Sequence, residues 1–142
     1  MDHIVYLDAR SNELEQLLQG KKTMIIRGAT GRKIPYGRIH VNDVLYFIRN
    51  NAEGTIKAKG VVSTVLQSEK MTEDESKTFV RNHQDALQLT EKQFQRWAGK
   101  RYIVLITIKD VTEIDPFTID KSDFSTMDDW LLVENIETVR TR

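Results

Sequence analysis

The chain has 142 residues, of which 39% are hydrophobic and 30% charged, and its formal net charge is zero. This length is enough for one globular domain over residues 1–142 with a sizeable core. The sequence contains no cysteine, which excludes disulfides, thiolate catalysis and cysteine-ligated zinc. It has neither a long apolar run nor the basic start and apolar middle of a signal peptide, so a cytoplasmic protein without a membrane partner is expected.

The zero net charge is the sum of two segments of opposite charge. Residues 21–59 contain nine lysines or arginines and two acidic residues, whereas residues 109–139 contain nine acidic residues and two lysines. Such an asymmetry is typical of a protein with an electropositive face for a polyanion. The two segments can also neutralise each other within the fold, and both explanations remain open.

The first elements of the chain are predicted to be a strand, a helix and a second strand. His3–Leu7 is apolar and β-like, and the helix Ser11–Gln19 has a serine at its N-cap and leucines at the spacing of one helical face. Gly20 follows where a left-handed C-cap is needed. The apolar, β-branched run Thr23–Ile26 then predicts a buried strand.

A hairpin is predicted next, after the turn-rich residues 28–37. The apolar run Val41–Arg49 and the segment Thr55–Leu66 are interpreted as paired strands. Gly60, inside the second of them, indicates a bulge or a close approach of two backbones.

Two helices follow, and each begins with the spacing of a capping box. Thr72 with Glu75 starts the first helix, and Thr90 with Gln93 starts the second. In the second helix Trp97 is expected to face the core together with Phe94, and base stacking by Trp97 is the alternative.

The end of the chain is predicted to add two strands. Arg101–Val111 has apolar residues on both faces, and Trp130–Val133 is a short apolar run. Asp128 and Asp129, just before it, are interpreted as a solvated turn. Five to seven strands with helices between them predict a mixed α+β domain, with a small barrel as its natural closure.

The junction between the first helix and the second strand carries a short motif. Gly20, Lys22 and Arg27 occur in the order G-x-K-x-x-x-x-R. This order resembles the signature of the ASCH domain family, whose members are similar to PUA domains. The resemblance implies a PUA-like small mixed β-barrel flanked by helices, with a cleft lined by this motif. If Lys21 and Lys22 bind no ligand, their place at the end of the helix has a structural explanation, because cations there interact favourably with the helix macrodipole.

The leading functional hypothesis is a module that binds RNA or a nucleotide-like ligand. In it, Lys22 and Arg27 contact phosphate or a base edge, and an aromatic side chain stacks on a base. The residues expected to bind are Lys21, Lys22, Arg27, Arg32, Lys33 and Arg49 for the electrostatic face, and Tyr36 or Trp130 for stacking.

The second hypothesis is a small hydrolase, either a ribonuclease or an amidohydrolase of a modified nucleoside. The family resemblance implies a catalytic lysine, threonine and glutamate for deacylation of modified cytidine. Lys22 matches the lysine, whereas Ile25 stands at the threonine position and Asp85 falls near the glutamate position. An alkyl side chain cannot attack a carbonyl, so an enzyme would use Lys22 and Asp85 without that nucleophile.

The third hypothesis is a protein-interaction domain that uses the acidic segment. In that case the basic segment is only its intramolecular partner. The three histidines, His3, His40 and His83, do not have the spacing of metal ligands, and a satisfied core or surface histidine explains them better. Neither a metal nor a cofactor is therefore expected, and the sequence predicts no oligomeric state.

Overall fold

A computed structural model describes residues 1–120 and 129–141. Each strand and helix expected from the sequence is present, and α3 and η1 are additional. The elements in chain order are β1 (Asp2–Leu7), α1 (Glu13–Leu18), β2 (Met24–Ala29), β3 (Val44–Arg49), β4 (Thr55–Gln67), α2 (Glu73–Arg81), α3 (Gln84–Leu87), α4 (Glu91–Trp97), β5 (Tyr102–Thr118), β6 (Trp130–Val133) and the short 3₁₀ helix η1 (Ile136–Thr138).

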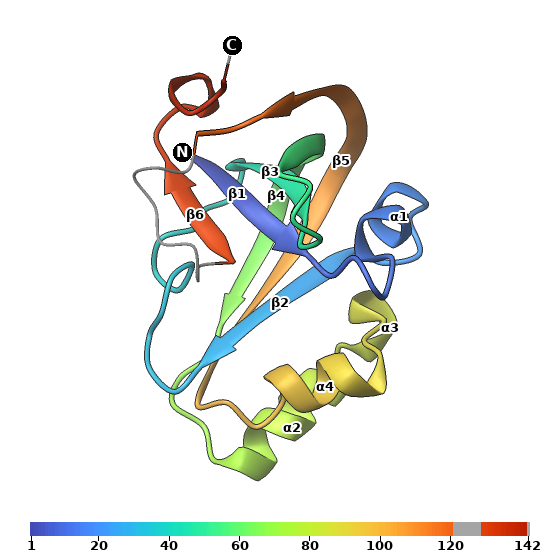
Figure 1. The fold of residues 1–142 in the computed structure, drawn as a ribbon. Coiled ribbons are helices and arrows are strands. Elements are labelled where there is room, and N and C mark those ends of the chain that lie inside the picture. Colours follow the sequence, from blue (N-terminus) through green and yellow to red (C-terminus); the bar gives the residue numbers. More distant parts are fainter. Residues whose placement is uncertain (121–128, 142) are drawn as a thin grey trace.

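The strands form one curved sheet with six strands in the order β2-β5-β4-β3-β1-β6. The pair β1 and β3 is parallel, and the other neighbours are antiparallel. The long strands β4 and β5 carry the curvature, and the sheet curls into a half-barrel (Figure 1). The expected α+β architecture is confirmed, with a half-barrel in place of a closed barrel. Its two edge strands, β2 and β6, lie at opposite ends of the sheet order.

Gly60 marks the place where β4 bends. The register between β4 and β5 shifts between Lys59 and Val61. A Cβ atom at position 60 would lie 2.6 Å from Cγ2 of Ile108 and 3.2 Å from Cε2 of Phe47. The bulge, one of the two alternatives predicted at this glycine, is therefore confirmed, and the atoms that a Cβ would meet belong to side chains and not to a neighbouring backbone.

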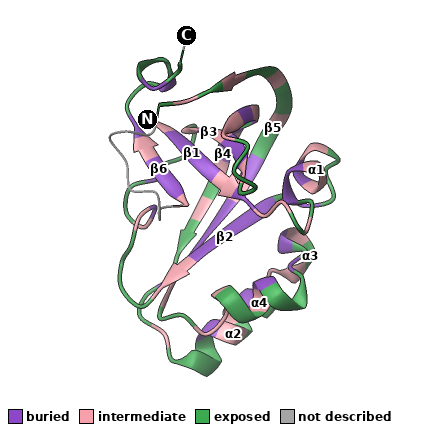
Figure 2. Cartoon of the chain, in the orientation of Figure 1, coloured by how far each residue is buried: buried purple, intermediate pink, exposed green. Residues whose placement is uncertain are grey.

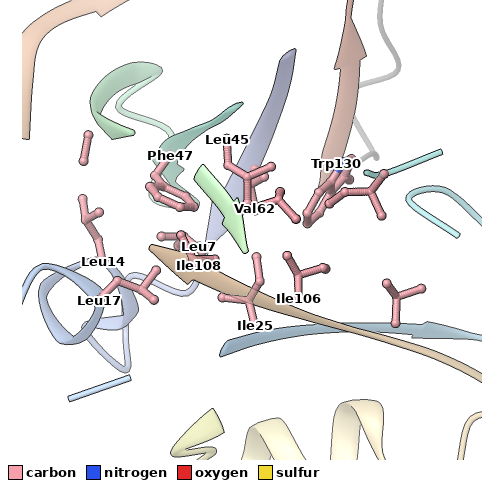
Figure 3. Close-up of a cluster of buried hydrophobic side chains, with 14 residues drawn as sticks. Leu7, Leu14, Leu17, Ile25, Leu45, Phe47, Val62, Ile106, Ile108 and Trp130 are labelled. Carbon is pink, nitrogen blue, oxygen red and sulfur yellow. The ribbon is translucent and has the colours of Figure 1, made fainter. Parts of the chain in front are cut away.

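The concave side of the half-barrel holds the main hydrophobic core. Side chains from α1 and from all six strands meet there, and Figure 3 shows Trp130 among them. The buried members of this cluster are Val5, Leu7, Leu14, Leu17, Ile25, Ile39, Leu45, Phe47, Ala58, Val62, Val104, Ile106, Ile108 and Trp130.

The helices α2, α3 and α4 gather on the outer side of β2 (Figure 1). There a second cluster joins Met24 and Ile26 of β2 to Val80, Leu87 and other apolar residues. Figure 2 shows β2 buried along most of its length while the helices keep an exposed face. Because β2 is covered on both sides, its side chains alternate between the concave core and the helix layer.

The predicted N-cap of α1 is wrong. The helix begins at Glu13, and its N-cap residue is Asn12, which has φ 56° and no side-chain capping hydrogen bond. Ser11 is used elsewhere, since its hydroxyl accepts a hydrogen bond from Gln93 of α4. The predicted C-terminus is confirmed, because Gly20 has φ +74°.

Within residues 1–120 and 129–141, no helix is long and apolar enough to cross a membrane. In the same part of the chain, no three or more histidine, aspartate or glutamate side chains come together as ligands for a metal ion.

Candidate nucleic-acid interface

A cleft of about 840 Å³ opens between the end of β1, the start of α1 and the helix α4. Its walls combine an aromatic ring with charged and amide side chains. The lining residues are Tyr6, Asp8, Arg10, Ser11, Glu13, Arg27, Asn50, Ala52, Thr90, Lys92, Gln93, Arg96, Trp97 and Asp129.

A smaller cavity of about 140 Å³ adjoins this cleft. The two share the lining residues Arg27, Arg96, Trp97 and Asp129. The smaller cavity extends toward the loop after β2, where Lys33 and Tyr36 line it. The shared residues therefore form the junction of one elongated groove.

Arg27 occupies the base of this junction. Its side chain comes from the edge strand β2 and is only 7% exposed. One guanidinium nitrogen, Nη1, donates a hydrogen bond to the carbonyl of Ile26 at 2.7 Å, and Nη2 donates to the carbonyl of Tyr6 in β1 at 2.6 Å. Since β2 and β1 are not neighbours in the sheet, Arg27 ties the two sides of the half-barrel together.

Two arginines converge on one carboxylate at the junction. Nε of Arg27 lies 3.4 Å from Oδ2 of Asp129, and Nη2 of Arg96 lies 3.3 Å from the same oxygen. The backbone of Asp129 is held independently, because its carbonyl accepts a 3.0 Å hydrogen bond from the amide of Tyr6. The carboxylate thus bridges β2 and α4 from the residue that precedes β6.

Trp97 presents an indole ring at the junction. It is half-buried at the C-terminal end of α4. The guanidinium carbon of Arg96 lies 4.4 Å from the ring centroid, and that of Arg27 lies 5.4 Å away. Guanidinium groups over an aromatic ring are attracted by its quadrupole, so the cations and the ring hold one another in place.

A capping box positions α4 and, with it, the polar wall of the cleft. The hydroxyl of Thr90 accepts a hydrogen bond from the amide of Gln93, and the side-chain oxygen of Gln93 accepts one from the amide of Thr90. The other end of the Gln93 amide donates to Oγ of Ser11 at 2.9 Å and to Oδ2 of Asp8 at 3.3 Å. This wall is therefore pre-organised by hydrogen bonds between α4 and the β1–α1 loop.

Lys22 lies behind the cleft and lines neither cavity. Two hydrogen bonds of a Schellman motif close α1: the amide of Lys21 donates to the carbonyl of Gln16, and the amide of Gly20 donates to that of Leu17. The side chain of Lys22 is then fully buried, with Nζ 2.8 Å from Oε2 of Glu13.

Glu13 is the carboxylate that links this buried lysine to the cleft. Its Oε1 accepts a hydrogen bond from the amide of Asp8 at 3.1 Å, while its Oε2 pairs with Lys22. The sequence suggested Asp85 for such a role, but Asp85 is exposed on α3 and lines neither cavity. Ile25, at the expected nucleophile position, is completely buried in the core.

No protein-family model matches the sequence, and no curated protein matches it. The fold, however, is similar to crystal structures of ASCH from Zymomonas mobilis, both the parent protein and two point mutants, with TM-scores of 0.70 and 15% identity. The parent structure covers 96% of this chain, which in turn covers 90% of that protein. The chain has the ASCH fold.

On the ASCH fold, the three residues of the G-x-K-x-x-x-x-R motif have different structural roles. Gly20 closes α1, Lys22 is buried against Glu13, and Arg27 alone reaches the groove. The expected cleft is present beside the motif, but Lys22 is not at its mouth. The motif thus builds the corner on which the groove rests.

The remaining residues of the expected basic face are divided among several places. Arg49 is paired with Glu15 and with Glu53, so its charge is neutralised. Arg32 is exposed and lies over the ring of Tyr36, at 5.8 Å from its centroid. Lys21 is exposed beside the end of α1 and lines neither cavity.

Trp130 is placed differently from its predicted stacking role. It is 1% exposed, and its indole N–H donates a 3.0 Å hydrogen bond to Nδ1 of His3. Tyr36 lines the smaller cavity, and its hydroxyl donates to the carbonyl of Ser68 at 2.6 Å. Trp97, for which stacking was only the alternative, is the tryptophan that lines the groove.

Several groove residues were missed from the sequence. Asp129 was assigned to a solvated turn, and Arg96 and Gln93 were given no functional role. One signal was available: the capping box at Thr90 puts Gln93 on the first turn of α4 and Arg96 one turn later. Asp129 could not be placed in this way, because its contacts with Arg27 depend on how the sheet curls.

Proposed function

We propose that this chain binds single-stranded RNA or a nucleotide in the groove, with a base against Trp97. One observation carries the proposal: a half-buried indole ring lines a cleft of about 840 Å³, and the guanidinium carbons of Arg96 and Arg27 lie 4.4 Å and 5.4 Å from its centroid. Aromatic rings beside cationic side chains are the usual platform for unpaired bases. The similarity to ASCH proteins supports a PUA-like fold for such a module.

The size and lining of the cleft suit a nucleotide unit. Ligand pockets for small molecules have volumes of about 300–1,000 Å³, and this cleft falls in that range. The carboxylate of Asp8 offers acceptors of the kind that read base edges, and the Gln93 amide, whose N–H groups donate to Asp8 and Ser11, holds this wall in place. The ring would supply stacking, and this polar wall would supply selectivity.

The charge of the groove supports moderate binding of an anion. Its basic side chains are Arg10, Arg27, Lys33, Lys92 and Arg96, against the carboxylates of Asp8, Glu13 and Asp129. This excess is smaller than the basic segment of the sequence implied, because Lys22 and Arg49 have carboxylate partners. We therefore expect few phosphate contacts and a shallow dependence of affinity on salt.

The hydrolase hypothesis has weaker support. Nζ of Lys22 is buried and has no hydrogen-bonding hydroxyl among the residues that the structure describes. A nucleophile and its base must lie within hydrogen-bond reach, and Ile25 offers no nucleophilic atom. The lysine and Glu13 instead form a buried ion pair that supports the wall of the cleft.

Titration of a labelled oligouridine at several salt concentrations tests the proposal. Trp97→Ala is expected to lose about 1–3 kcal/mol of binding free energy, the usual contribution of one stacked base. Trp97→Phe, the matched control, keeps an aromatic face and should retain most of the affinity. Absence of binding by the wild type at low salt, or equal affinity of Trp97→Ala, would refute the proposal.

A further inference from the structure

We propose that Arg27 and Arg96 form a phosphate-binding subsite at the junction of the two cavities, and that the carboxylate of Asp129 occupies it in this structure. The inference rests on the proposed function and adds the place where the ligand's phosphate binds. The ligand class is a phosphate group, either the terminal monoester of a nucleotide or an internal diester of RNA.

The geometry around Asp129 carries the first step. Nε of Arg27 lies 3.4 Å from Oδ2 of Asp129, and Nη2 of Arg96 lies 3.3 Å from the same oxygen. Here two guanidinium groups from different elements lie close to one anionic oxygen. The same arrangement suits an oxygen of a phosphate group. The carboxylate is therefore a stand-in for the oxygen of a phosphate.

The second step is the unfilled hydrogen-bonding capacity of Arg27. A guanidinium has five N–H donors, and two of its nitrogens donate to the carbonyls of Ile26 and Tyr6. Its Nε is buried and makes no hydrogen bond to the described residues, although Oδ2 of Asp129 lies 3.4 Å away. A buried donor without a partner costs free energy. A phosphate oxygen at this place would satisfy it.

The third step is the ease with which Asp129 can leave. Its side chain is 31% exposed and that of Arg96 is 58% exposed, whereas that of Arg27 is only 9% exposed. The carboxylate can rotate into water while its backbone carbonyl keeps the hydrogen bond from Tyr6. Exchange of one anion for another then requires only side-chain rotation around a fixed arginine.

The subsite also lies where a nucleotide needs it. Both arginines are within 5.4 Å, guanidinium carbon to centroid, of the Trp97 ring. A base against this ring would have its phosphate close by, because one sugar separates the two. The groove continues on both sides of the junction, so a strand could pass through it with a diester at the subsite.

The test measures binding of inorganic phosphate to the whole chain, from the phosphate-dependent rise in Tm and from the NMR signals of the arginine Nε–H groups. Asp129→Asn is expected to bind phosphate roughly tenfold more tightly than the wild type, because a competing charge is removed from within 4 Å of both cations. Asp74→Asn is the matched control. It removes the same charge from an exposed position on α2 that lines neither cavity, and should change affinity by less than about threefold.

Adding Arg96→Ala to Asp129→Asn should abolish the gain, and Arg96 is exposed enough for this change to leave the fold intact. The inference is overturned if Asp129→Asn binds phosphate no better than the wild type, if Asp74→Asn gains as much, or if the gain survives the loss of Arg96. Oligouridine is titrated in parallel. If RNA binds but Asp129→Asn gains no affinity for phosphate, the subsite is refuted and the proposed function stands. If Asp129→Asn gains affinity for phosphate but RNA does not bind, the subsite stands and RNA binding is refuted. Uridine 5′-monophosphate against oligouridine without a terminal phosphate then distinguishes the monoester from the diester.

Discussion

At the scale of single residues, Lys22 and Arg27 differ in what they offer a ligand. Both belong to the same short motif and both are buried. Lys22 lies 2.8 Å from Glu13 and lines neither cavity, whereas Arg27 holds Tyr6 and lines both cavities of the groove. A basic residue in a motif is thus available for binding only when the fold places it on the wall of a cavity.

The pair of Lys22 and Glu13 gives a prediction for stability. Glu13→Gln should lower the free energy of unfolding by about 3–5 kcal/mol, because it leaves a buried ammonium without its counter-charge. Glutamine keeps an oxygen for the Asp8 amide, so the loss reports the charge. The double variant Glu13→Gln with Lys22→Met should recover much of that loss. Urea denaturation of the wild type, Glu13→Gln, Lys22→Met and the double variant gives the coupling energy, and additive losses would contradict the buried-pair account.

His3 gives a prediction for pH. The Trp130 N–H can only donate, so Nδ1 of His3 accepts and the neutral ring donates through Nε2 to Asp43, 2.8 Å away. Burial lowers the pKa of His3 below its ordinary value of 6.5, and the hydrogen bond to Asp43 opposes this only in part.

In the unfolded chain His3 takes up a proton at a higher pH than in the fold, so the unfolded state binds more protons over that interval. The free energy of unfolding should therefore be independent of this group above pH 6.5 and should fall as the pH drops from there toward the folded pKa. Denaturation of the wild type and of His3→Gln between pH 5 and 8 checks it. Stability of the wild type that rises on acidification, relative to His3→Gln, would contradict the assignment of a neutral buried histidine.

At the scale of elements, α4 supplies the indole ring and one of the two arginines at the junction of the groove. It supplies Gln93, Arg96 and Trp97 within seven residues, and its N-terminal capping box fixes the direction in which they point. The helix is too short to be stable alone, so its position depends on this cap and on packing against β2.

Thr90→Ala should therefore affect stability and binding together. Loss of the capping hydroxyl is expected to cost about 0.5–2 kcal/mol of unfolding free energy and to weaken oligouridine binding by disordering the start of α4. Thr90→Ser keeps the hydroxyl and should behave like the wild type. Thr72→Ala removes the equivalent cap of α2, which contributes no residue to the groove, and should lower stability alone. Equal binding losses for Thr72→Ala and Thr90→Ala would argue against a specific role of α4.

Local signals in the sequence were sufficient for most elements and insufficient for the site. The capping boxes at Thr72 and Thr90 and the left-handed Gly20 involve residues within a few positions of each other, and all were predicted correctly. The pairing of Arg27 with Asp129 joins residues about a hundred positions apart, and it exists only because the sheet curls. For the same reason the sequence named Trp130 rather than Trp97 for stacking.

At the scale of the whole molecule, the groove lies at the seam of the half-barrel. The edge strand β2 lies on one side of the groove. The end of β1 and Asp129, the residue before β6, lie on the other side. Arg27 and Asp129 close this seam with polar contacts where a complete barrel would have paired strands. Because Nε of Arg27 has no hydrogen bond to the described residues, a ligand that binds at the seam can supply one.

The segregation of charge along the sequence persists only in part. Most ion pairs of the basic segment, residues 21–59, are with Glu13, Glu15 and Glu53. Among the residues described, the pair of Arg27 and Asp129 connects this segment to the acidic segment, residues 109–139. Mutual neutralisation of the two segments is thus limited. If the wild type binds no oligouridine at low salt, a small ligand or a protein partner becomes the better hypothesis for the remaining charges.

The two tryptophans allow the most direct test of the central claim, that the ligand binds against Trp97. The chain has two indole N–H groups, one at the groove and one buried against His3. In ¹⁵N NMR spectra, with assignment by Trp97→Phe, oligouridine should shift the Trp97 indole signal strongly and leave that of Trp130 nearly in place. A Trp97 signal that stays unchanged at RNA concentrations that saturate binding would contradict the account.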